Sequence, residues 1–87
     1  MANYRWLRCE VQRGMLGEEF AVAVNTSGGR ASLFASAEKV AEVTGSSGLL
    51  MVEMLDYDAQ HGLVRLPSGS IEGPSIVRVD KSELTTR

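Results

Sequence analysis

The chain has 87 residues, too few to divide into two units that each bury a core, so residues 1–87 are expected to form one small domain. Apolar residues make up 44% of the sequence and charged residues 23%, a balance typical of folded globular proteins that excludes a disordered chain. The formal net charge of −2 disfavours a dedicated nucleic-acid binder, because such proteins are usually basic.

The cellular setting follows from cysteine usage and from the apolar runs. Cys9 is the only cysteine, so no intramolecular disulfide can form, whereas a secreted domain of this size usually depends on disulfides. The longest uninterrupted apolar run is only five residues, 20–24, far below the roughly 18 residues that a membrane span needs. No continuous apolar segment follows the basic N-terminal residues, which argues against a signal peptide. We therefore expect a reduced, cytoplasmic protein without a membrane segment.

Short stretches of alternating apolar and polar residues recur along the chain. A period of two places every second side chain on the same face of an extended strand, so this pattern predicts β-structure. In chain order, the expected strands are 4–12, 18–25, 30–36, 49–57, 63–67 and 75–80. The breaks between them contain glycine, serine or aspartate, which are typical of turns. They lie at 13–17, 26–29, 45–48 and 58–62.

The segment 36–43 fits two structures. Ala37, Val40 and Ala41 have helical spacing, with Ser36 as a possible N-cap and Gly45 as a possible stop. The same residues also fit a strand that bends at Ser36 and resumes at Val40. Both alternatives remain open from the sequence.

An all-β domain of this length has few ways to cover its strand edges. The expected architecture is a small antiparallel meander of five to six strands curled into a barrel, with one short helix or turn near 36–43. This arrangement is similar to SH3-like barrels, a similarity of architecture that implies no function. The alternation predicts a single core, formed by Leu7, Val11, Phe20, Val22, Val24, Leu33, Val52, Met54, Val64, Leu66, Val77 and Val79.

Catalytic and metal-binding patterns are missing from the sequence. It contains no phosphate-binding glycine loop, no metal-spaced Cys/His pair and no nucleophile motif, so we expect neither an enzyme nor a cofactor. His61 is the only histidine and lies in a predicted turn, as a solvated residue does. Cys9 alternates with buried positions, which predicts an inert thiol. Asp56 and Asp58 flank the same turn and are interpreted as turn residues rather than cation ligands.

The first strand offers the candidate binding residues. If Leu7 points inward, then Tyr4, Trp6 and Arg8 share the outer face, and these residue types are enriched at binding hot spots. The alternative is that Trp6, the only tryptophan, closes the end of the barrel or packs under the C-terminal residues.

The strand 49–57 is apolar on both faces, which predicts that both faces are covered. Leu50, Val52 and Met54 alternate with Leu49 and Met51, followed by Leu55 and Tyr57. The cover can be the segment 36–43, the curvature of a tight barrel, or another protein chain.

Two functions therefore stay open for this expected barrel. The leading hypothesis is a non-catalytic module that binds a protein partner or associates with itself through Tyr4, Trp6 and Arg8. The second is an RNA- or DNA-contacting barrel with Trp6 as a stacking platform. Its phosphate contacts would come from Arg5, Arg8, Arg13, Arg30 and Arg78.

Overall fold

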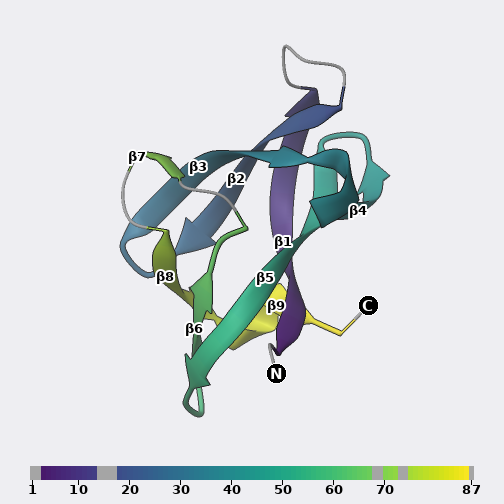
Figure 1. Cartoon of the computed structure of the whole chain (residues 1–87). Coiled ribbons are helices and arrows are strands. Elements are labelled where there is room, and N and C mark those ends of the chain that lie inside the picture. The colour runs from purple at the N-terminus through teal and green to yellow at the C-terminus, as the bar shows by residue number, and fades with distance from the viewer. Residues whose placement is uncertain (1–2, 14–17, 68–69, 73–74, 87) are drawn as a thin grey trace.

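The computed structural model describes residues 3–13, 18–67, 70–72 and 75–86 and is built almost entirely of strands (Figure 1). The turn expected at 13–17 thus lies largely outside the described residues. The described residues form β1 (Tyr4–Arg13), β2 (Glu19–Thr26), β3 (Gly29–Ser36), β4 (Val40–Thr44), β5 (Ser47–Tyr57), β6 (His61–Arg65), β7 (Ser70–Glu72), β8 (Ile76–Asp80) and β9 (Leu84–Thr85). All six expected strands are present within a few residues of their predicted bounds. The short strands β4, β7 and β9 are additional.

The strands form one antiparallel sheet in the order β7-β3-β2-β1-β5-β6-β8, with β4 paired to β5 and β9 paired to β1. This order departs from a simple meander at three places, because β7 lies beside β3, β5 lies beside β1 and β8 lies beside β6. Strand β5 is long enough to pair with β1 and β6 in addition to β4. Its first part pairs with β1 from Glu10↔Ser47 to Tyr4↔Glu53, and its last part pairs with β6 from Glu53↔Arg65 to Tyr57↔Gly62.

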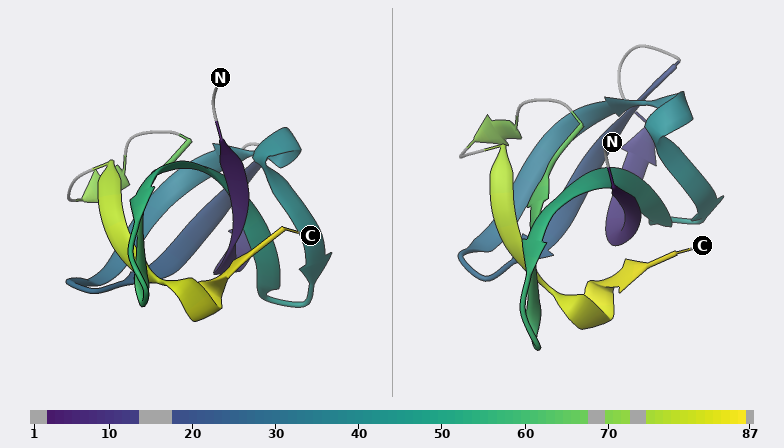
Figure 2. Two further views of the ribbon diagram at one scale, coloured as in Figure 1. Left: turned by 90° about the horizontal axis from the view of Figure 1, so that it is seen from below. Right: turned by 60° about the horizontal axis from the view of Figure 1, so that its bottom comes forward.

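The sheet curls into a half-barrel, as expected for a fold this small (Figure 2). The register of β5 against β6 shifts between Met54 and Asp56, and such a bulge bends a strand and increases its twist. The backbone N–H of Ser27, after β2, donates to the carbonyl of Arg78 in β8 at 2.8 Å. This bond links β8 to the opposite side of the sheet. The all-β, barrel-like fold is therefore confirmed.

The segment 36–43 is a bent strand and not a two-turn helix. Ala37–Lys39 form a single 3-10 turn (η1), and the chain is extended again from Val40. Val40 then pairs with the buried Leu50 of β5. A helix of two turns gains too little from its own hydrogen bonds to be stable. Pairing with β5 satisfies the same backbone groups and brings Val40 against the core.

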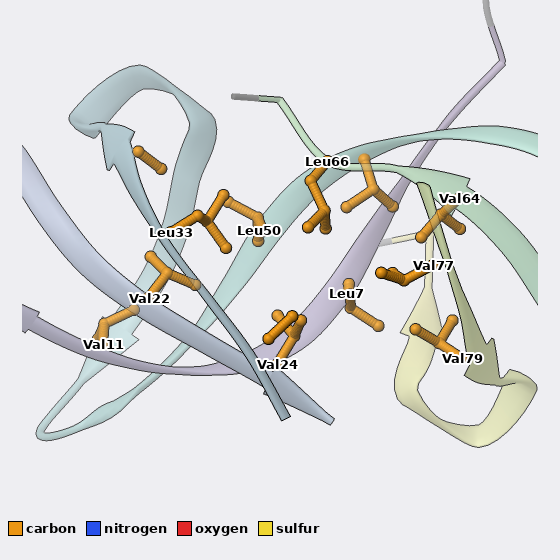
Figure 3. Close-up of a cluster of buried hydrophobic side chains, with 13 residues drawn as sticks. Leu7, Val11, Val22, Val24, Leu33, Leu50, Val64, Leu66, Val77 and Val79 are labelled. Atoms are coloured by element: carbon orange, nitrogen blue, oxygen red, sulfur yellow. The ribbon is translucent and has the colours of Figure 1, made fainter. Parts of the chain in front are cut away.

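One apolar core fills the inside of the half-barrel (Figure 3). The buried residues of the core come from most of the strands. They are Leu7, Val11, Val22, Val24, Ala31, Leu33, Ala35, Leu50, Val52, Val64, Leu66, Val77 and Val79. The expected inward register is therefore correct on every predicted strand.

Two predicted core residues are less buried than expected. Phe20 and Met54 pack against the core but remain half-buried, because Phe20 lies near the start of β2 and Met54 lies at the β5 bulge. Three core residues were not predicted. Ala31 and Ala35 are small, and Leu50 belongs to a run that is apolar at every position.

Within the described residues, no helix has the length and apolar character required to traverse a bilayer.

Candidate interaction surface

Strand β1 places Tyr4, Trp6 and Arg8 on the face opposite to the buried Leu7. Tyr4 is 55% exposed, Arg8 is exposed and Trp6 is half-buried. Trp6 also lies directly opposite Thr85 of the C-terminal strand β9. The sequence left open whether Trp6 is on the surface or beside the C-terminal residues. In the structure it is both: its side chain is partly exposed, and it lies opposite Thr85 near the C-terminus.

Strand β5 extends this outer face with apolar side chains. Directly opposed residues of an antiparallel pair project to the same side of the sheet. Trp6 is opposite Met51, and Arg8 is opposite Leu49. Leu49 and Met51 are half-buried. We call Trp6, Leu49 and Met51 the outer strip, which Tyr4 and Arg8 border.

The segment 36–43 was one of the three possible covers for the second face of β5, but its extended part, β4, does not cover that face. It pairs edge to edge with β5, with Ala41 opposite Leu49, and so widens the sheet instead of lying across the outer strip. The outer strip therefore keeps apolar surface that the core does not use.

A groove of about 490 Å³ lies beside the outer strip. Arg8 and Leu49 line it together with Glu42, Thr44 and Thr85. Glu42 has a φ of 51°, in the left-handed region that ordinary residues rarely adopt. It lies where the register of β4 against β5 shifts between Ala41 and Thr44. The wall of the groove that contains Glu42 is thus a bulge, at which the regular pairing of β4 with β5 is interrupted.

Several basic residues near this surface already face carboxylates. Arg65 of β6 donates to Glu53 of β5 at 3.1 Å, and Arg30 of β3 forms an ion pair with Glu10 of β1. Arg8 shares its groove with Glu42. The positively charged guanidinium groups therefore lie among negatively charged carboxylates. A surface of this kind differs from the unbroken basic patch that phosphate backbones require.

The turn between β5 and β6 is organised by Asp58. Its Oδ1 accepts hydrogen bonds from the backbone N–H groups of Gln60 and His61, each at 2.8 Å. These two bonds hold the pKa of the Asp58 carboxyl below its ordinary value. The Nδ1 of His61 lies 3.8 Å from the same oxygen, and His61 begins β6 as a partly exposed residue. Both residues have local structural contacts in this turn.

Cys9 is half-buried between the core and the groove. Burial raises the pKa of its thiol to about 11, so the thiol is protonated at neutral pH. A nucleophilic cysteine requires the opposite shift. Among the residues that the structure describes, no group of three or more His, Cys, Asp or Glu side chains could hold a metal ion.

Residue alternation alone could identify Tyr4, Trp6 and Arg8, but not their neighbours. Leu49, Met51 and Glu42 join them only through the pairing of β1, β4 and β5, which are distant in the sequence. For Leu49 and Met51, the signal in the sequence was that β5 is apolar on both faces.

The comparisons with known proteins found no relative: no family model matches the chain, and neither does a curated protein or a solved structure.

Proposed function

We propose that the chain is a non-catalytic β-barrel module that makes protein–protein contacts through the outer strip, with Tyr4, Trp6 and Arg8 as its principal contact residues. The carrying observation is the register of β1 on β5, which joins Trp6, Met51 and Leu49 into one apolar strip outside the core. Aromatic and arginine side chains around apolar neighbours are the composition of interface hot spots.

The occupant that we propose is a second copy of the chain. The borders of the strip carry both signs of charge, through Arg8 and Glu42 on one side and the Arg65–Glu53 ion pair on the other. Two copies can therefore meet without placing a single-sign patch against itself. The net charge of −2 also keeps long-range repulsion between copies small.

We place this association in the cytoplasm. The free thiol of Cys9 and a fold held together by its core fit a reducing compartment. A nucleic-acid role gains less support, because Arg30 and Arg65 already pair with carboxylates and the chain is acidic overall.

The test is sedimentation velocity across a range of protein concentrations. The wild type should shift from monomer to dimer as its concentration rises, and Trp6→Ala should weaken the association by about 2 kcal/mol or more. The matched control is Phe34→Ala, since Phe34 is an exposed aromatic residue (45%) of β3 outside the outer strip. Phe34→Ala should associate like the wild type.

Circular dichroism melting shows whether each variant is folded. A wild type that stays monomeric at the highest concentration would contradict self-association. Equal effects of Trp6→Ala and Phe34→Ala would contradict the placement of the interface.

A further inference from the structure

A second cavity lies at the end of the half-barrel where β1 begins and the β5–β6 hairpin turns, the end that faces forward in Figure 2. Its volume is about 420 Å³. The residues that matter here are Arg5 of β1, Met54 and Tyr57 of β5, Lys81, and Leu84 of β9. We call this cavity the lower mouth. Ends of β-barrels are common positions for small-molecule sites.

The floor of the lower mouth is apolar. Met54 and Leu84 form this floor: both are half-buried, and both pack against the core while lining the cavity. Gly62 of β6 allows them to come together, because a Cβ there would lie 2.9 Å from Leu84 Cδ1 and 3.1 Å from Met54 Cε. An apolar group of a ligand can thus rest on a floor that is already packed.

The walls of the lower mouth are cationic. The Nη1 of Arg5 is held in place by hydrogen bonds to Asn3 Oδ1 at 2.6 Å and to the Tyr4 carbonyl at 2.9 Å. Lys81 lies in the short 3-10 turn η2 (Lys81–Glu83), and its Nζ lies 4.9 Å from the centroid of the Tyr57 ring. None of the described residues that line the cavity is acidic. This sets it apart from the groove at the outer strip, which Arg8 and Glu42 line together.

From these contacts we infer that the lower mouth is a binding site for a carboxylate that carries an apolar or aromatic group. The carboxylate would lie between Arg5 and Lys81, and the apolar group would lie against Met54, Leu84 and the ring of Tyr57. Both halves of such a ligand meet matching chemistry, because charge-assisted hydrogen bonds fix the carboxylate and the floor excludes water from the apolar group. The carboxylate can belong to a small molecule or to the C-terminus of a polypeptide.

The test is an NMR titration of the ¹⁵N-labelled protein with N-acetyl-L-phenylalanine and with its uncharged carboxamide. The acid should shift the amide signals of Arg5, Met54, Tyr57 and Lys81 in a saturable manner. The carboxamide should bind about fivefold more weakly or worse, since it lacks the charge. Equal affinity for the two probes, no saturable shift at millimolar concentrations, or shifts confined to other strands would overturn the inference.

Two variants test the cationic walls. Lys81→Gln and Arg5→Gln should each weaken binding of the acid by about fivefold. The control is Lys39→Gln, because Lys39 is the basic residue of the other 3-10 turn, η1, and lies outside the lower mouth. If Lys39→Gln weakens binding as much as Lys81→Gln, the assignment of the binding site to the lower mouth is contradicted. The dispersion of each variant's spectrum shows that it is folded, and Lys81 is exposed, so its replacement should not disturb the core.

A short peptide ending in phenylalanine, with a free or an amidated C-terminus, separates the two sources of the carboxylate. Tighter binding of the free-acid peptide than of N-acetyl-L-phenylalanine would identify a polypeptide C-terminus. Weaker binding of that peptide would identify a small carboxylate. Equal binding of the free and amidated peptides would count against a carboxylate site.

Discussion

The two faces of the β1–β5 pair share the same strands and differ in what lies over them. On the inner face, Leu7, Leu50 and Val52 are at most 1% exposed and form the centre of the core. On the outer face, Trp6 and Met51 are half-buried and no sheet layer packs on them within the described chain. An apolar side chain on a strand therefore does not by itself identify the core. Whether it is buried depends on what packs over that face of the sheet. The inner and outer faces should therefore respond differently to substitution.

The largest effect is expected from truncating the inner face. Leu50→Ala should lower the free energy of unfolding by about 2–5 kcal/mol, because it removes fully buried methyl groups and leaves a cavity. Its matched control is the adjacent Leu49→Ala, which should cost less than about 2 kcal/mol since Leu49 is only half-buried on the outer face. Urea unfolding of dilute protein measures both. Equal losses would show that the outer face is as deeply packed as the inner one.

An intermediate effect is expected at the margin of the core. Phe20 points inward with Val22 and Val24, but it is half-buried. Phe20→Ala should therefore cost about 1–3 kcal/mol, below the usual range for a fully buried phenylalanine. The same urea experiment applies. A loss larger than that of Leu50→Ala would show that Phe20 is a central core residue.

The smallest effect is expected at Asp58, which lies outside both faces. Its carboxylate accepts two backbone hydrogen bonds, which lower its pKa in the folded state. A lowered pKa stabilises the fold above the unfolded value of about 3.9, and this contribution is lost as the pH falls through the folded pKa. Asp58→Ala should thus melt at a lower temperature than the wild type at neutral pH. The gap should close in strongly acidic buffer; a gap that persists there would mean that the charge is not responsible.

These contrasts also explain what the sequence could predict. Alternation is a local property, so it placed Leu7 and Val52 inward and Tyr4 and Trp6 outward before any pairing was known. It placed Leu50 on the same face as Val52 but did not assign it to the core, because the run 48–52 lacks a polar residue to show which of its faces is buried.

Long-range pairing was beyond the same reasoning. The position of β1 beside β5 gives Trp6 its neighbour Met51, and the short strand β9 brings Thr85 opposite Trp6. Neither contact leaves a signal in the adjacent sequence. The segment 36–43 stayed ambiguous for a related reason, because its extended form depends on the pairing of Val40 with Leu50.

The most direct test of the central claim is the concentration dependence of the melting temperature for the wild type and for Met51→Lys. A dimer that forms through the outer strip makes the wild type melt higher as the protein concentration rises. Met51→Lys places a charge in the strip, so its melting temperature should stay constant and equal that of the wild type at high dilution. The control Phe34→Lys should behave like the wild type. A wild-type melting temperature independent of concentration, or a Met51→Lys variant much less stable even at high dilution, would contradict the assignment of the outer strip as an interface.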